Sequence, residues 1–220
     1  MTCPRHLPCG ALAALIVIGA GGLFGGIAED VVNGDPLTLV DAQIAAWFHA
    51  HAFPALTSAM LFVSALHGTW GITVLSLLVA LAFIVKREWN WLLALTLVVP
   101  GGMLLNVLTK HAFGRARPSF ADPIVTLTTF SFPSGHVAAA TLFYGLLGAL
   151  IATRIEGSGR RLLVGLVAAL AVALVALSRI YLGAHYLSDV LAAFAESIAW
   201  LALCLTAVHL LTHRGAGRRG

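Results

Sequence analysis

Charged residues are scarce in this chain of 220 residues. Asp, Glu, Lys and Arg together make up only 10% of it, whereas 60% of the residues are hydrophobic. Soluble domains carry about 25% charged and about 45–50% apolar residues, so the composition excludes a soluble globular domain. The 13 Lys and Arg residues are also too few and too scattered for a nucleic-acid-binding groove. The sequence therefore predicts an integral membrane protein in the bilayer, with residues 1–220 forming a single domain.

Cysteine and carboxylate residues are also rare. The three cysteines, Cys3, Cys9 and Cys204, are too few for a disulfide framework, and their spacing matches no zinc motif. Nine Asp and Glu residues in the whole chain offer no carboxylate cage for a hard cation. His49 and His51 form a pair without a third ligand at suitable spacing. We therefore expect no metal and no other cofactor.

Long apolar runs, by contrast, are abundant. A helix needs about 20 apolar residues to cross roughly 30 Å of hydrocarbon. Six runs approach or meet this length, at residues 11–28, 68–85, 91–109, 136–153, 162–180 and 187–210. The segment from Pro36 to about Leu66 has apolar residues at helical spacing opposite Asp41 and Gln43, which predicts an amphipathic helix in the interface. The expected fold is all-α, a six-transmembrane-helix bundle with this interfacial helix after the first span.

The first apolar run has two interpretations. Arg5, an apolar stretch and small residues up to Ala28 are also typical of a cleaved signal peptide. However, the run over residues 11–28 exceeds the about 7–15 residues of a typical signal core. An uncleaved first span is therefore favoured.

Basic residues divide into two groups along the chain. Nine fall at the termini or in the second and fourth connections between spans: Arg5, Lys86, Arg87, Arg154, Arg160, Arg161, Arg214, Arg218 and Arg219. An even number of spans puts these nine on one side, which the positive-inside rule makes cytoplasmic. Four others fall on the opposite side: Lys110, Arg115, Arg117 and Arg179. The sequence thus predicts a multi-pass protein of the cytoplasmic (inner) membrane, with both termini inside and a bound anion at the outer face.

The first polar cluster, residues 110–118, joins the end of the third span to a short loop. Lys110 and Arg117 offer two positive charges to an anion. The alternative is that Lys110 caps the end of the helix and Arg117 meets lipid headgroups. Arg115 is expected to be a headgroup or loop contact.

The second cluster, residues 132–136, opens the fourth span. Ser134 and Gly135 precede His136 at a predicted helix N-terminus, where free N–H groups and the helix dipole attract anions. Gly135 allows a close approach of the backbone to an oxygen atom. An ordinary Ser N-cap is the alternative.

The third cluster, residues 178–189, joins the fifth and sixth spans. Arg179 ends one span, and His185 with Asp189 opens the next. Positions i and i+4 share a helix face, so Asp189 can accept from one nitrogen of His185 and leave the other nitrogen free as a nucleophile. A carboxylate inside a span is functional by default. A purely structural Asp–His pair is the alternative.

The three clusters in this order resemble the type 2 phosphatidic acid phosphatase (PAP2) superfamily of membrane lipid phosphatases. The matching patterns are Lys-x6-Arg-Pro, Pro-Ser-Gly-His and Ser-Arg-x5-His-x3-Asp. The resemblance implies that His185 attacks phosphorus, Asp189 orients it, and His136 protonates the leaving oxygen before activating water. It also implies a phosphate-binding set, without a metal, formed by Lys110, Arg117, Ser134, Gly135 and Arg179.

The implied function is hydrolysis of a phosphomonoester or diphosphate of a lipid. Undecaprenyl diphosphate is the leading expectation, and phosphatidylglycerol phosphate and phosphatidic acid are the others. A lipid phosphotransferase using the same histidine, or a non-catalytic lipid-phosphate-binding or transport protein, are alternatives. No obligate protein partner is evident. Three further residues stay open between a structural role and a place at the site: His67, His111 and Glu196.

Overall fold

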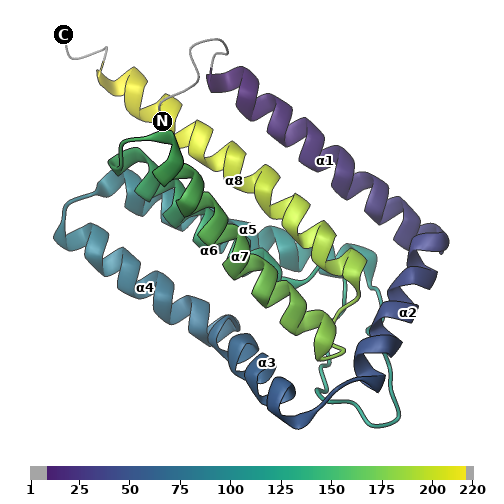
Figure 1. The fold of residues 1–220 in the computed structure, drawn as a ribbon. Coiled ribbons are helices and arrows are strands. Elements are labelled where there is room, and N and C mark those ends of the chain that lie inside the picture. Colours follow the sequence, from purple (N-terminus) through teal and green to yellow (C-terminus); the bar gives the residue numbers. More distant parts are fainter. Residues whose placement is uncertain (1–8, 217–220) are drawn as a thin grey trace.

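The computed structural model describes residues 9–216, and within that range the chain is helical without strands. In chain order the helices are α1 (Cys9–Asn33), α2 (Pro36–Ala50), α3 (Pro54–Leu66), α4 (Thr69–Val85), α5 (Trp89–Phe113), α6 (Gly135–Arg154), α7 (Ser158–Tyr181) and α8 (Leu187–Ala216) (Figure 1). The predictions made on Cys3, Arg5, Arg218 and Arg219 lie outside the described residues.

Within residues 9–216, five helices are long and apolar enough to cross a membrane by themselves: α1, α5, α6, α7 and α8. The sixth candidate span consists of α3 and α4, which are bent by 48° where they meet. The break lies at His67 and Gly68, before the first turn of α4. The predicted all-α membrane bundle is therefore confirmed, with five to six candidate spans. The predicted second span, residues 68–85, corresponds to α4, which reaches the length of a span only together with α3.

The single interfacial helix expected from Pro36 to about Leu66 is wrong. The chain forms two helices there, because Pro54 lacks an N–H donor and disfavours helical backbone at the residue before it. Phe53 accordingly has extended dihedral angles, with φ −140° and ψ 152°. The expected polar face of α2 is wrong as well, since Asp41 is completely buried whereas the apolar Trp47 is exposed.

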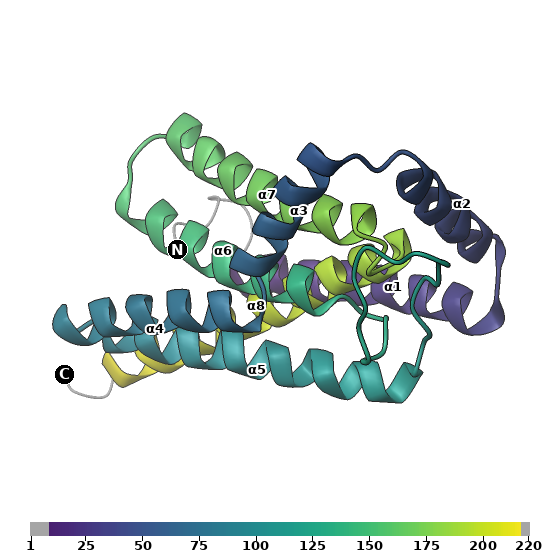
Figure 2. The ribbon, with the colours of Figure 1, turned by 90° about the horizontal axis from the view of Figure 1, so that it is seen from below.

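The centre of the bundle is formed by α6 and α8, which contact each other and α5. Helix α1 lies along α8, and α7 lies along α6 (Figures 1 and 2). Close approach depends on glycine, since a Cβ atom on Gly102 would lie 2.5 Å from Leu142 and one on Gly145 would lie 2.5 Å from Leu201. This tight packing holds the middle of α6 against α5 and α8.

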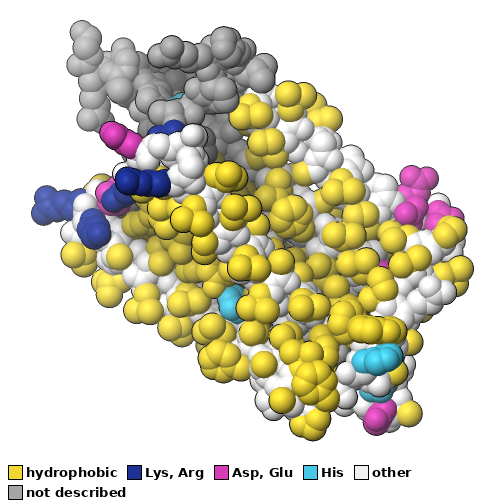
Figure 3. Space-filling model, viewed as in Figure 1, with side chains coloured by type: hydrophobic (Ala, Val, Ile, Leu, Met, Phe, Trp, Pro, Cys, Tyr) yellow, Lys and Arg dark blue, Asp and Glu magenta, His cyan; other side chains and the backbone are white. Residues whose placement is uncertain are grey.

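The two ends of the bundle differ in their charges. The start of α1, the end of α8 and the connections α4–α5 and α6–α7 share one end (Figure 1). Lys and Arg side chains gather there, while hydrophobic side chains cover most of the visible flank (Figure 3). The three motif clusters lie at the opposite end. Among the described basic residues, the division between the two ends follows the prediction, and which end faces the cytoplasm stays a prediction.

Candidate active site

The three clusters meet where α5 and α7 end and where α6 and α8 begin. Backbone hydrogen bonds join them, since Ser134 N donates to Asp189 O at 3.0 Å and Ser131 N donates to Arg115 O at 2.8 Å. A cavity of about 960 Å³ opens onto this junction. Six predicted site residues line it: Lys110, Arg117, Gly135, His136, Arg179 and His185. The other two, Ser134 and Asp189, are buried beside it.

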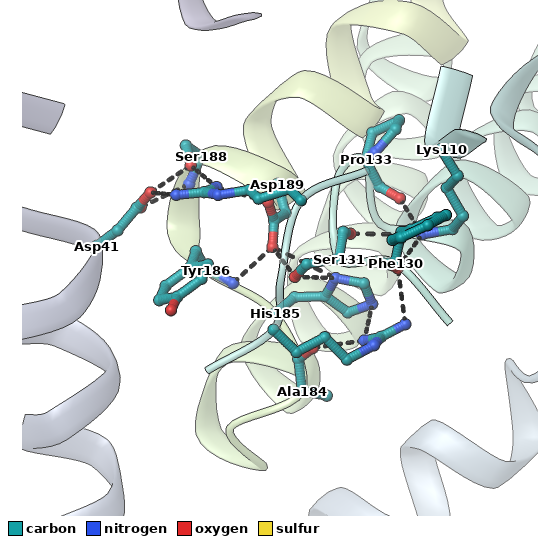
Figure 4. Close-up of polar contacts among 12 residues, drawn as sticks. Asp41, Lys110, Phe130, Ser131, Pro133, Ala184, His185, Tyr186, Ser188 and Asp189 are labelled. Carbon is teal, nitrogen blue, oxygen red and sulfur yellow. Dashed lines mark hydrogen bonds and ion pairs between the residues drawn. The ribbon is translucent and has the colours of Figure 1, made fainter. Parts of the chain in front are cut away.

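Lys110 and Arg117 are held by backbone carbonyls of the loop between α5 and α6. Gly114 ends α5 in a left-handed conformation, with φ 59°, so that the chain turns back over the helix end. Lys110 Nζ donates to Phe130 O at 3.0 Å and to Pro133 O at 2.5 Å (Figure 4). Arg117 donates from Nε to Thr129 O at 2.6 Å. These contacts fix both cations at the mouth of the cavity, and lipid headgroups are not needed to explain them.

His185 lies between a carboxylate and a guanidinium. Its Nδ1 lies 3.5 Å from Asp189 Oδ2 and 3.5 Å from Ser131 Oγ. Its Nε2 accepts from Arg117 Nη1 at 3.1 Å. This arrangement favours the tautomer that carries its proton on Nδ1, so that the lone pair of Nε2 faces Arg117, which lines the cavity.

The predicted reason for the His185–Asp189 pairing needs correction. His185 is not on the helix face of Asp189, because α8 begins only at Leu187. Instead, Asp189 occupies the third position of α8 and its Oδ2 accepts from the backbone N–H of Tyr186 at 2.8 Å. This is one half of a capping box, which turns the carboxylate back toward the residues that precede the helix. Ser131 Oγ donates to the same oxygen at 2.5 Å.

Burial shapes the electrostatics of the loops around the cavity. Burial lowers the pKa of His185 to about 4, since the nearby charges of Arg117 and Lys110 add to it and Asp189 only partly offsets it. Burial also lowers the pKa of Arg117 from its usual value. The imidazole of His185 is therefore neutral near pH 7, which is the state that a nucleophile requires.

The start of α6 offers unpaired polar groups. Ser134 is the N-cap of α6, but its hydroxyl makes no capping hydrogen bond and is buried without a protein partner. Gly135 lines the cavity, and a Cβ atom there would lie 3.4 Å from Asn106 Oδ1. Nearby, Arg179 donates to Ser64 Oγ on α3 while its Nε is buried without a protein partner. Two donors beside the cavity, the Ser134 hydroxyl and Arg179 Nε, thus have no partner within the described protein.

Arg115 was expected to contact headgroups or the loop, and this expectation is wrong. Its guanidinium lies between two buried carboxylates, with Nη1 at 2.6 Å from Asp189 Oδ1 and Nη2 at 2.8 Å from Asp41 Oδ2. Reasoning from the sequence also missed Ser131 and Ser188, whose hydroxyls contact these carboxylates. Ser131 lies one residue before the second cluster, which was the only available signal. Asp41 has no nearby motif at all.

The three residues whose roles the sequence left undecided, His67, His111 and Glu196, have hydrogen-bond partners in the structure. Glu196 accepts from Asn106 Nδ2 at 3.1 Å and Thr109 Oγ1 at 2.7 Å, so it pairs inside the bundle. His67 lines the cavity, but its ring nitrogens are engaged by Val63 O and the Tyr144 hydroxyl. His111 also lines the cavity, with Nδ1 at 2.8 Å from Val107 O.

The His49 and His51 pair does not form a cluster of ligands. His49 Nε2 lies 2.9 Å from Asp122 Oδ1, whereas the His51 ring stacks on Trp47. In the part of the chain that the structure describes, no group of three or more His, Cys, Asp or Glu side chains gathers as a metal site would.

The cavity extends away from the motif residues as an apolar groove between α4 and α5. Its far end is lined by Leu77 and Ala80 on α4 and by Leu95 and Thr96 on α5. Lys110 and Leu95 are 15 residues apart on one helix, which is about 22 Å at 1.5 Å per residue. One leaflet contributes about 15 Å of hydrocarbon, so the groove is long enough for a lipid tail.

The part of the chain that builds this site matches a known protein family. Residues 87–212, more than half of the chain, match the model of the PAP2 superfamily. The chain belongs to the PAP2 superfamily. The matched range covers the three clusters and all eight predicted site residues, but it excludes α2 and therefore Asp41.

Two PAP2 relatives are named for lipid substrates. The chain is 37% identical over 113 residues to phosphatidylglycerophosphatase B of Bacillus subtilis (strain 168), a match that covers 51% of this chain and 55% of that protein. It is also 37% identical over 131 residues to lipid A 1-phosphatase of Rhizobium etli, covering 55% of this chain and 50% of that protein. The matches thus span about half the length of these relatives.

Two solved structures resemble the PAP2 fold found here. One is a transmembrane PAP2-type phosphatidylglycerolphosphate phosphatase from Bacillus subtilis, with a TM-score of 0.79 and 27% identity over 87% of this chain and 95% of that one. The other is LpxE of Aquifex aeolicus, with a TM-score of 0.60 and 19% identity over 76% of this chain and 95% of that one. The second likeness concerns the fold alone.

Proposed function

We propose that this PAP2 protein is a metal-independent phosphatase that hydrolyses a phosphate or diphosphate group on a membrane lipid. The observation that carries the proposal is the cavity. Lys110, Arg117 and Arg179 line its head together with His136 and His185, and its other end is an apolar groove between two helices. A polar head of this charge joined to an apolar groove fits a lipid with an anionic phosphate better than it fits a soluble phosphate ester.

The proposed reaction has two steps with a phosphohistidine intermediate. Arg117 transfers its hydrogen bond from His185 Nε2 to a phosphoryl oxygen, and the freed lone pair of Nε2 attacks phosphorus. The bond to the lipid oxygen breaks, and a protonated His136 gives that oxygen a proton. Water then attacks phosphorus, His136 accepts its proton, and the P–N bond breaks to restore His185. Asp189 offsets the positive charge that the imidazole carries in the intermediate. Lys110, Arg117, Arg179 and the N–H groups at Ser134 and Gly135 would stabilise the phosphoryl oxygens.

The substrate is the finer part of the proposal. Phosphatidylglycerol phosphate is supported by the names of one relative and one solved structure, both from Bacillus subtilis, and the groove is long enough for a lipid tail. Undecaprenyl diphosphate, the leading expectation from the sequence, gains no support from those names. We therefore rank phosphatidylglycerol phosphate first. We place the site in the cytoplasmic membrane, on its outer face, because of the charge distribution.

The test is phosphate release by the purified full chain in detergent micelles. The panel contains phosphatidylglycerol phosphate, phosphatidic acid, undecaprenyl diphosphate and glycerol 3-phosphate, the last as a soluble control without a tail. We expect release from at least one lipid, the highest kcat/KM for phosphatidylglycerol phosphate, and little release from the control. Release from none of the lipids, with binding retained, would favour a non-catalytic lipid-phosphate-binding protein. Transfer of phosphate to an added lipid alcohol in place of water would favour a phosphotransferase.

A further inference from the structure

A buried ionic network extends from the proposed catalytic pair to a helix outside the motif clusters. Asp41 on α2 has no exposed surface and accepts three hydrogen bonds. The donors are Ser188 N at 2.9 Å, the Ser188 hydroxyl, and Arg115 Nη2 at 2.8 Å (Figure 4). Because a buried carboxylate is costly without such partners, Asp41 and Arg115 are coupled.

Arg115 joins this carboxylate to Asp189. Its Nη1 donates to Asp189 Oδ1 at 2.6 Å and to Ser188 Oγ at 2.7 Å, and its guanidinium lies 4.4 Å from the centre of the Tyr186 ring. Neither Arg115 nor Asp41 is among the residues that line the cavity. These two residues therefore act on substrate only through other groups.

The two oxygens of Asp189 have separate partners. Oδ1 faces Arg115, whereas Oδ2 faces Ser131, the Tyr186 N–H and His185 Nδ1. A guanidinium bound to Oδ1 fixes the rotation of the carboxylate, so that Oδ2 stays directed at the imidazole. The geometry thus makes Arg115 the residue that orients Asp189.

Charge alternates along the same path. Asp41 is negative, Arg115 is positive, Asp189 is negative, and His185 becomes positive when it is phosphorylated. Burial opposes the charge on Arg115, but Asp189 and Asp41 outweigh it and raise the pKa of Arg115. The positive charge of Arg115 offsets part of the negative charge of Asp189. Asp41 in turn offsets part of the positive charge of Arg115.

We propose that Asp41 and Arg115 form a positioning relay that orients Asp189 and sets how strongly Asp189 stabilises positive charge on His185. This inference rests on the proposed histidine mechanism. It assigns a role in the reaction to α2, which lies outside the part of the chain that matches the family model.

The relay predicts that Arg115→Gln and Asp41→Asn shift the acid limb of kcat/KM in opposite directions. Arg115→Gln removes a positive charge beside Asp189, so the imidazolium of His185 is stabilised and the acid limb of kcat/KM moves to higher pH. Asp41→Asn removes a negative charge, so the acid limb moves to lower pH. A change of one unit charge beyond an intervening carboxylate gives a shift of roughly one pH unit at an effective dielectric constant near 20.

None of the other charged or titratable groups that face His185 is substituted in either variant. They are Asp189 on α8, Arg117 in the loop, Lys110 on α5, His136 on α6 and Arg179 on α7. The pKa of the substrate phosphate is also common to all variants. The difference between each variant and the wild type therefore reports on the relay.

The experiment uses the full chain in detergent with phosphatidylglycerol phosphate as the probe. For both single variants we expect kcat to fall about 10- to 100-fold, as for the loss of a hydrogen bond to a charged group, while KM stays within about twofold. Arg115→Lys keeps the charge but cannot bridge two carboxylates in the same way, so kcat falls while the acid limb stays near that of the wild type. The matched controls are Arg154→Gln and Glu88→Gln, which break the 2.6 Å ion pair at the opposite end of the bundle and leave kcat unchanged.

Arg115→Gln leaves Asp41 and Asp189 uncompensated, so it risks misfolding. The double variant Asp41→Asn/Arg115→Gln removes both charges, and we expect it to fold with a lowered kcat, an unchanged KM and an acid limb between those of the single variants. Folded variants that keep the wild-type kcat overturn the proposal, as do single variants whose acid limbs shift in the same direction or not at all. If the network only holds α2 against α8, the acid limbs would not shift and the melting temperature would fall.

Failure of the histidine mechanism can be told apart from failure of the relay. If the wild type forms no phosphohistidine in a rapid-quench experiment, the proposed function fails whatever the variants do. If the wild type forms it and both variants form it at the wild-type rate, the relay alone is refuted.

Discussion

Replacing Asp189 by Asn keeps the shape of the side chain but puts an NH₂ group where an oxygen now accepts. The Oδ1 position receives the Arg115 guanidinium at 2.6 Å. The Oδ2 position receives the Ser131 hydroxyl at 2.5 Å and the Tyr186 N–H at 2.8 Å. Whichever way the amide turns, its NH₂ group meets a donor inside the protein. The variant therefore loses both the charge and part of the hydrogen bonding.

The expected effect is large on activity and moderate on stability. A buried donor left without an acceptor costs about 1–3 kcal/mol, and each kcal/mol lowers the melting temperature by about 2–4 °C in a chain of this size. The amide also cannot offset the charge on a phosphorylated imidazole. We expect kcat to fall on the order of 10²-fold or more, as for other carboxylates that orient a catalytic histidine.

The assay is phosphate release at saturating lipid, with the melting temperature measured in the same detergent. Ser131→Ala is the matched control, because it removes one donor to Asp189 and leaves Arg115 and Tyr186 in place. Its kcat should fall by about tenfold at most. A loss below about threefold in a folded Asp189→Asn variant would refute the reasoning and make Asp189 a structural residue.

Three further predictions concern pH, metal and topology. Burial lowers the pKa of His185 to about 4 in the folded chain. The wild type is therefore about 3 kcal/mol more stable above pH 6.5 than below pH 4, and this stability is lost as the pH falls from 6.5 through 4. The melting temperature of His185→Gln should fall less over this range than that of the wild type, and parallel curves would contradict this. Activity should survive exhaustive EDTA treatment and be inhibited by orthovanadate, whose five-coordinate form resembles the transition state; loss on chelation with rescue by Mg²⁺ would show that the basic residues are insufficient. Single cysteines at Ala121 and Ser158, both exposed, in a chain without its three native cysteines should be labelled by an impermeant maleimide on intact cells at position 121 only; the reverse pattern would put the site on the cytoplasmic side.

The sequence was sufficient to predict the helical bundle and the assembly of the three clusters. Long apolar runs define spans whatever their neighbours are, because the hydrocarbon thickness sets their length. Successive spans cross the membrane in alternate directions. Each cluster lies at a span end that falls on the same side, so the three clusters are expected to meet at one end of the bundle. This is why Lys110, His136 and His185, although far apart in sequence, could be expected around one cavity.

The partners of these residues could not be predicted, because they depend on packing. Arg115 and Asp41 are 74 residues apart and carry no shared motif. The pattern of α2 alone put Asp41 on a solvent-facing side, whereas a buried guanidinium reverses that preference. The capping geometry of Asp189 also required knowing that α8 begins at Leu187, and helix boundaries are set by local hydrogen bonds that a periodicity does not locate.

The attack of His185 on phosphorus is tested most directly by trapping the intermediate. Full-length protein is mixed with lipid radiolabelled in its terminal phosphate, quenched within milliseconds, and digested for peptide mapping. We predict an acid-labile, alkali-stable label on His185 in the wild type and no label in His185→Ala. Label on His136 or another residue, or an unlabelled wild type that still turns over, would contradict the assignment of His185 as the nucleophile.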